Sequence, residues 1–214
     1  MTALRIAIDG PAGSGKSTLA RGLARRLHLP YVNTGLMYRA LTRKALELGL
    51  DLDDGDALAG LARTLTVDLD QTLDPPELRI DGAVPGSELS TPEVEGAVSL
   101  VSSHPAVRQV MVERQRALGT DGVVMEGRDI GRVVLRDEAS VKIYLDARPD
   151  ERADRRILER GASAEALAHR DALDATTNPF EPAEDAIRLD TSGLTTEETL
   201  AGALAIVDEE RERE

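Results

Sequence analysis

Short apolar runs alternate along this chain with stretches in which apolar residues recur every three or four positions. The first run covers residues 4–8, and the stretch after it carries Leu19, Leu23 and Leu27 on one helical stripe. Continuous runs are typical of buried strands, and periodic stripes are typical of amphipathic helices. Alternating strands and helices predict an α/β protein with a parallel sheet and helices on both of its faces.

The same pattern predicts the remaining elements. Four further strands are expected at residues 30–33, 122–126, 141–145 and 186–190. Helices are expected at residues 34–48, 53–63, 91–103, from 105 onward, 149–160, 165–174 and 195–207, with a solvated helical tail after them. A chain of 214 residues buries one sizeable core, so a single domain with a five-stranded sheet follows.

Residues 65–80 depart from this rhythm. Residues 65–69 alternate between apolar and polar, Asp74-Pro75-Pro76 favours a turn, and residues 78–80 continue the alternation before Asp81-Gly82. A period of two on both sides of a turn predicts a β-hairpin. We interpret it as an insertion into the α/β core.

The amino-acid composition limits the classes of binding partner and the cellular compartment that we expect for this protein. A formal net charge of -13 argues against nucleic acid, and one Phe, three Tyr and no Trp leave little for stacking on bases. With no Cys, disulfides and thiolate metal sites are excluded. No run approaches a membrane span and no signal sequence is recognised, so we expect a cytoplasmic protein without a membrane partner.

A phosphate-binding loop follows the first strand. The motif G-x-x-x-x-G-K-[ST] is formed by Gly10, Pro11, Ala12, Gly13, Ser14, Gly15, Lys16 and Ser17, with Thr18 next. Glycines let the backbone turn its N–H groups toward a polyphosphate, Lys16 neutralises the terminal phosphates, and the Ser17 hydroxyl can bind Mg²⁺. Because a strand precedes the motif and a helix follows it, we predict an ATP site here.

Charged residues follow two later strands. Glu126-Gly127-Arg128-Asp129 ends a fully apolar run, at the strand end where parallel sheets bind ligands. After the next strand, Arg148, Arg152, Arg155 and Arg156 share one helix face. They suit a polyphosphate, or they form salt bridges with Glu151, Asp154 and Glu159 on the same helix, and the sequence favours neither alternative.

Two anion sites facing each other are therefore expected. One would hold ATP with Mg²⁺, and the other would hold a smaller acceptor that carries a phosphate. Phosphoryl transfer asks a protein mainly for positioning and for cations around the spreading charge. An acceptor phosphate is already anionic at neutral pH, so no general base is required.

Taken in order, the motifs resemble those of the bacterial cytidylate kinases over nearly the whole chain. The resemblance is carried by residues 9–18, 33–39 (Asn-Thr-Gly-Leu-Met-Tyr-Arg), 91–94 (Thr-Pro-Glu-Val), Ser99, 104–108 (His-Pro-Ala-Val-Arg), 126–131 (Glu-Gly-Arg-Asp-Ile-Gly), 142–145 (Lys-Ile-Tyr-Leu), and Arg170-Asp171 with Asp174. It implies a P-loop fold with a core at about 1–63 and 119–214, a monophosphate-binding insertion at about 64–118, and a lid at about 150–175. The implied substrates are ATP and CMP or dCMP, and we expect a monomer.

The resemblance also implies roles for individual residues. Arg39 and Arg128 would grip the CMP phosphate, Ser99, Arg108 and Asp129 would read the cytosine, Thr34 and Tyr38 would line the same pocket, and Asp174 would hold the sugar. Lys16, Arg128, Asp129 and Arg170 would form the catalytic set, with Arg170 reaching the phosphates from the lid. Thr177 stands where relatives commonly have a lid arginine, so Arg152 or Arg156 is expected to substitute at the ATP site.

Two other functions compete with this interpretation. A phosphate-loop kinase for UMP or another small metabolite would lack the base-reading set of Ser99, Arg108 and Asp129. A nucleotide-gated switch of the small GTPase kind would need an Asn-Lys-x-Asp motif, which the sequence does not contain. The sequence therefore favours a nucleoside monophosphate kinase.

Overall fold

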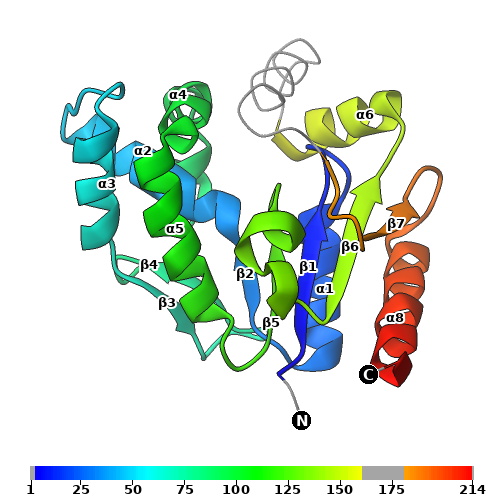
Figure 1. The fold of residues 1–214 in the computed structure, drawn as a ribbon. Helices are drawn as coiled ribbons and strands as arrows, with labels where there is room; N and C mark the ends of the chain where they lie inside the picture. The colour runs from blue at the N-terminus through cyan, green and yellow to red at the C-terminus, as the bar shows by residue number, and fades with distance from the viewer. Residues whose placement is uncertain (1–2, 161–180, 214) are drawn as a thin grey trace.

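Five parallel strands form the central sheet of the protein. Figure 1 shows the computed structural model, which describes residues 3–160 and 181–213, with the backbone alone at 156–160. The strands are β1 (Arg5–Asp9), β2 (Tyr31–Asn33), β5 (Val123–Glu126), β6 (Val141–Asp146) and β7 (Ile187–Asp190), in the spatial order β2-β5-β1-β6-β7. The predicted parallel five-stranded sheet is confirmed, and all four residues of β5 are buried.

Helices cover both faces of the sheet, and each face has its own hydrophobic cluster. On one face Ile6 and Ile8 pack with residues of α1 (Lys16–Leu27) and α8 (Thr196–Arg213). On the other, Ala7 packs with residues of α2 (Thr34–Glu47) and α5 (Pro105–Leu118). Alternate residues of β1 therefore enter opposite layers, as the pleat of a strand requires.

The predicted hairpin and its neighbouring helices lie beside β2. Between α2 and α5 come α3 (Gly55–Thr64), β3 (Val67–Asp70), β4 (Glu77–Ile80), η1 (Ser87–Ser90) and α4 (Pro92–Ser103). Strands β3 and β4 pair antiparallel, and the Tyr31 N–H donates to the Pro76 carbonyl at 2.8 Å. That bond joins the start of the hairpin's second strand to the edge strand of the core. The hairpin itself is on the left of Figure 1.

Local sequence explains where the helices of this region begin. The Thr91 hydroxyl accepts the Val94 N–H at 3.4 Å, and Pro92 follows at the first helical position, where its missing N–H has no effect. The Asn33 side chain caps α2 in the same way. Helix α4 ends before His104-Pro105, because a residue before proline is pushed out of the helical region.

Residues 130–138 form two short helical turns that the hydrophobic pattern does not predict. Residues Ile130–Val134 make a π-helical turn, η2, and residues Arg136–Glu138 make a 3₁₀ turn, η3. Ile130 and Val134 are each 1% exposed, so the turn is stabilised by apolar contacts. The helical period of apolar residues does not predict it. This segment directly follows the Gly-Arg-Asp motif.

Helix α6 (Pro149–Arg160) lies at the top of Figure 1. The predicted helix at 165–174 lies outside the described residues. None of the helices that the structure describes combines the length and the apolar character needed to span a bilayer.

Candidate active site

The phosphate loop connects β1 to α1, which begins at Lys16. Gly15 is the N-cap in a left-handed conformation (φ 89°), and no described side chain caps this end of the helix. The first N–H groups of α1 therefore remain available to an anion. Lys16 Nζ donates to the Pro11 carbonyl at 2.7 Å, which holds the ammonium group against the loop.

Gly13 is the point at which α6 rests on this loop. Its φ is 76°, and a Cβ atom placed on it would lie 2.5 Å from the Arg152 carbonyl oxygen of α6. Arg152 Nη1 donates to the Ala12 carbonyl at 3.0 Å. The backbone and side chain of Arg152 thus both contact the loop, and its role at the ATP site stays a prediction.

The structure shows the salt-bridge alternative for two arginines of the cluster around α6, and binding of a polyphosphate stays a prediction. Arg148, just before α6, and Arg155 within it form ion pairs with Glu151 of this helix. Arg155 also donates to the Thr191 carbonyl at 2.9 Å, and the Thr191 hydroxyl lies 3.3 Å from the Ser14 carbonyl oxygen. Salt bridges and contacts toward the loop therefore coexist.

Asp9, the last residue of β1, is a buried carboxylate between two parts of the site. Its oxygens accept the N–H groups of Ile130 at 2.7 Å and Gly131 at 2.8 Å. Burial raises the pKa of Asp9 to about 6 against the lowering effect of these two bonds, while Asp129 adds to the rise and Lys16 opposes it. Because Lys16 and Asp129 act on one carboxylate, the phosphate loop and the Gly-Arg-Asp motif lie together.

Asp129 forms an ion pair with Arg108 of α5. Burial raises the pKa of Tyr38 on α2 to about 12. Arg108 lowers this pKa and Asp129 raises it, so both charged groups act on Tyr38. Burial and the nearby carboxylates of Asp146 and Asp9 raise the pKa of Tyr144 on β6, which Arg128 lowers. Residues from α2, α5 and the end of β5 therefore converge.

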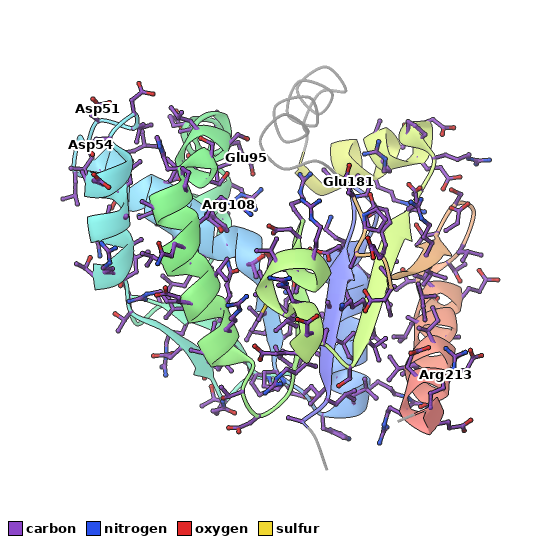
Figure 2. All side chains as sticks on the ribbon, in the orientation of Figure 1. Asp51, Asp54, Glu95, Arg108, Glu181 and Arg213 are labelled. Carbon is purple, nitrogen blue, oxygen red and sulfur yellow. The ribbon has the colours of Figure 1, made fainter. Side chains whose placement is uncertain are left out.

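The start of α2 supplies Thr34 and Arg39. Thr34 Oγ1 donates to the Glu126 carbonyl at 2.9 Å, which fixes the helix start to the end of β5. Arg39 is 6% exposed and forms an ion pair at 3.0 Å with Glu95 of α4, the helix on which the buried Ser99 also lies. A buried guanidinium needs such a partner. Glu95 and Arg108 lie on the flank of α4 and α5 that is turned toward the sheet (Figure 2).

Most of the residues predicted for the site are described, and some are not. Arg170, Asp174 and Thr177 lie outside the described residues, as do the side chain of Arg156 and the predicted lid beyond residue 160. The assignment of these residues to the lid stays a prediction.

A metal ion could use only a small set of protein ligands here. Ser17 is exposed on the first turn of α1. Within residues 3–160 and 181–213, no three His, Asp or Glu side chains are grouped to hold a metal ion. One hydroxyl fits Mg²⁺ that arrives with phosphate oxygens and water, which is how this ion is commonly bound, and does not fit a resident metal centre.

Two residues of the site were given no role from the sequence. Asp9 carried a usable signal, because an acidic residue at the end of an apolar buried strand is out of place unless it has partners. Glu95 carried none, since acidic residues in the first turn of a helix are common for reasons of the helix dipole alone. Its pairing with Arg39 depends on how α2 and α4 pack.

The fold and the loop define a phosphate-loop protein of the kinase type. A family model for cytidylate kinase matches residues 6–209. The chain is 44% identical to the cytidylate kinase of Geobacillus sp. (strain WCH70), covering 96% of this chain and 97% of that protein. It is 47% identical to the cytidylate kinase of Roseiflexus castenholzii, covering 94% and 91%. The chain belongs to the cytidylate kinase family.

A solved structure supports the fold independently. TT1252 from Thermus thermophilus is similar with a TM-score of 0.54, covers 98% of both chains and shares 22% of their residues. At that identity the likeness shows the architecture alone.

Proposed function

We propose that this protein transfers the γ-phosphate of ATP to CMP or dCMP, giving ADP and CDP or dCDP. The observation that carries the proposal is the meeting around Asp9 of Lys16, from the phosphate loop, and Asp129, which is paired with Arg108. A donor site and a polar acceptor pocket at one sheet edge are what transfer between two phosphates requires. Membership of the family supports cytosine as the base.

The charged groups divide between the two substrates. Lys16 and Arg128, with Arg170 from the lid, would offset the charge that spreads over the transferred group. Arg39 and Arg128 would hold the acceptor phosphate, because guanidinium forks match phosphate oxygens in pairs. Arg39 is paired with Glu95 in the structure, so an incoming phosphate would take over a partner role that a carboxylate already fills.

Recognition of the base is assigned to a second group of side chains. Ser99, Arg108 and Asp129 would form hydrogen bonds with the edge of cytosine, beside Thr34 and Tyr38. A pocket that bonds the polar edge of its substrate discriminates strongly, since a wrong base leaves buried polar groups unpaired. Asp174 would hold the sugar.

Mg²⁺ is proposed to enter with ATP, and Ser17 is the residue that would hold it. When bound, the ion would supply positive charge that offsets part of the charge of the phosphates. The other positive charges of the site would come from Lys and Arg side chains of the protein.

The test is ADP release measured with a panel of acceptors: CMP, dCMP, UMP, AMP and shikimate. We expect CMP or dCMP to give the highest kcat/KM. Lys16→Ala should lower kcat by about 100-fold or more, because a cation facing the transferred phosphate is lost. Preference for a metabolite without a base, or GTP hydrolysis with no acceptor, would contradict the proposal.

The proposal also takes the protein to work as a cytoplasmic monomer that needs neither nucleic acid nor a membrane. The high negative charge and the absence of Cys support it. Light scattering after size-exclusion chromatography measures the oligomeric state, and the mass of a dimer would contradict the proposed monomer.

A further inference from the structure

Asp9 joins the residue before the phosphate loop to the segment after the Gly-Arg-Asp motif. Oδ1 accepts the Ile130 N–H and Oδ2 accepts the Gly131 N–H, and these buried bonds span 121 and 122 positions of sequence. Two oxygens thus match two successive N–H groups. Such paired, charge-assisted bonds fix the direction of a peptide as well as its distance.

The segment that Asp9 holds is also fixed at its other end. Arg116 of α5 donates from Nε to the Val134 carbonyl at 2.6 Å. A Cβ atom on Gly131 would lie 3.3 Å from Asp9 Oδ2 and from the Lys142 side chain, so the peptide approaches β1 closely. The turn η2 is therefore held between the donor side and α5.

Charged groups approach Asp9 from several elements. Lys16 of α1 and Asp129 before η2 act on its carboxylate, and Asp9 in turn acts on Tyr144 of β6. On β5, Glu126 is aligned with Ile8, so its side chain belongs to the other face of the sheet, where it accepts the Tyr31 hydroxyl at 2.8 Å. A cation of the donor site and a carboxylate of the acceptor site thus both influence the charge of Asp9.

A single hydrogen bond to this turn could be accepted by a neutral side chain at position 9. Burying a carboxylate is unfavourable, and a neutral side chain can close the end of a strand without that penalty. An Asp is required where both of its oxygens must accept, because Asn and Ser offer fewer acceptors in the same volume. The two N–H groups that it holds come immediately after Arg128 and Asp129.

We propose that Asp9 is a positioning residue that sets the distance between the donor and acceptor sites, by holding Arg128 and Asp129 in register with the phosphate loop. The inference rests on the proposed function. Transfer between two bound substrates depends on their alignment, and a misplacement of about 1 Å can cost about 100-fold in rate. Asp9 itself touches neither substrate in this proposal.

The test compares Asp9→Asn with the wild type. Asn keeps the shape but replaces one acceptor oxygen with an NH₂ group facing a backbone N–H. We expect kcat/KM for CMP to fall by about 10-fold to 100-fold, while the Kd of ATP measured by calorimetry stays at the wild-type value. Amide hydrogen exchange of Ile130 and Gly131 in the unliganded protein should become faster, which reports the lost bonds without any catalysis.

Two further variants separate position from charge and from capping in general. Asp9→Glu keeps the charge but moves the oxygens by one methylene, so it should not restore kcat/KM. Asp54→Asn is a control for loss of a capping carboxylate elsewhere, because Asp54 accepts two N–H groups through its Oδ1 alone, from Asp56 and Ala57, at the remote start of α3 (Figure 2). It should show wild-type kinetics.

The outcomes that overturn the inference differ from those that overturn the function. Equal kcat/KM in the wild type and Asp9→Asn, unchanged exchange at Ile130 and Gly131, or full rescue by Asp9→Glu would overturn the positioning role alone. A wild-type protein that does not phosphorylate CMP would overturn the proposed function and this inference with it. Circular dichroism of each variant checks that the fold is retained.

Discussion

At the scale of single residues, the ion pair between Asp129 and Arg108 connects the end of β5 to α5. Asp129 is 13% exposed at its side chain and Arg108 is 25% exposed, so the pair is shielded from water but open to a ligand. Hydrogen bonds in such a setting are stronger than hydrogen bonds on the surface, because little water competes for the same groups.

Removing Asp129 should therefore affect the choice of base more than turnover itself. We expect Asp129→Ala to reduce the ratio of kcat/KM for CMP to that for UMP by about 10-fold or more, as the bonds that distinguish the two bases are lost. The measurement is the ADP-release assay with both acceptors. Asp137→Ala, an exposed position in η3, is the control. A wild-type ratio in the Asp129 variant would show that another residue reads the base.

Asp9 also gives stability a particular pH dependence. Its pKa rises on folding from 3.8 to about 6, so its favourable contribution is complete below pH 3.8 and is lost as the pH rises through 6. Asp9→Asn is neutral throughout. The free energy of unfolding of Asp9→Asn minus that of the wild type should therefore increase by about 2 kcal/mol from about pH 4.5 to about pH 7.5.

Urea unfolding of both proteins at the two pH values measures this difference. Lys16, Asp129 and Tyr144, which face Asp9, are present in both proteins, so their own titration largely cancels. A difference that stays constant with pH would mean that Asp9 does not titrate in this range.

At the scale of elements, the contact between α6 and the phosphate loop is made through Gly13. An Ala there would combine an unfavourable positive φ with a Cβ atom 2.5 Å from a carbonyl oxygen of α6. We expect Gly13→Ala to raise the KM for ATP by about 10-fold or more, because a displaced loop misaligns its N–H groups. Steady-state kinetics with ATP varied at saturating CMP measures it.

Gly49 provides a matched control for that substitution. It also has a positive φ, 63°, but a Cβ atom there would meet nothing within 4 Å. Gly49→Ala should lose about 1–2 kcal/mol of stability and keep wild-type kinetics. Equal effects of both variants on the KM for ATP would show that backbone strain, and not the approach of α6, matters at Gly13.

At the scale of the whole molecule, the hairpin region, from α3 to α5 (residues 55–118), does not have a separate core. Met111 of α5 and Leu58 of α3 belong to the same buried cluster as Ala7 and Met125 of the sheet. The second cluster, around Leu23, lies on the opposite face of that sheet. One sheet thus forms part of both cores, which favours cooperative unfolding.

Met111→Ala and Leu23→Ala should each lower the free energy of unfolding by about 2–5 kcal/mol, since both side chains are fully buried. Each variant should still unfold in one calorimetric transition. Leu48→Ala, at a side chain that is 60% exposed, should stay within about 0.5 kcal/mol of the wild type. Two separate transitions in Met111→Ala would mean that the hairpin region folds independently.

Much of this architecture could be predicted because its signals are local. The apolar run before Asp9 indicated β1, the alternating residues 65–69 and 78–80 indicated the hairpin, and Thr91-Pro92 indicated the start of α4. Each depends on neighbours only a few positions away. The turn η2 escaped prediction because its apolar residues fit neither a helical nor a strand period, and it is held by Asp9 and Arg116 from outside.

The sequence by itself determined the elements, their parallel arrangement and the phosphate loop, since periodicity and motif spacing are written in adjacent residues. It also placed Thr34, Arg39 and Asp129 near strand ends. Only the tertiary structure decided which groups meet: Asp9 with the backbone after Asp129, Arg39 with Glu95, and Arg152 with the loop. These contacts join segments 56 to 140 positions apart, and only packing between layers sets such distances.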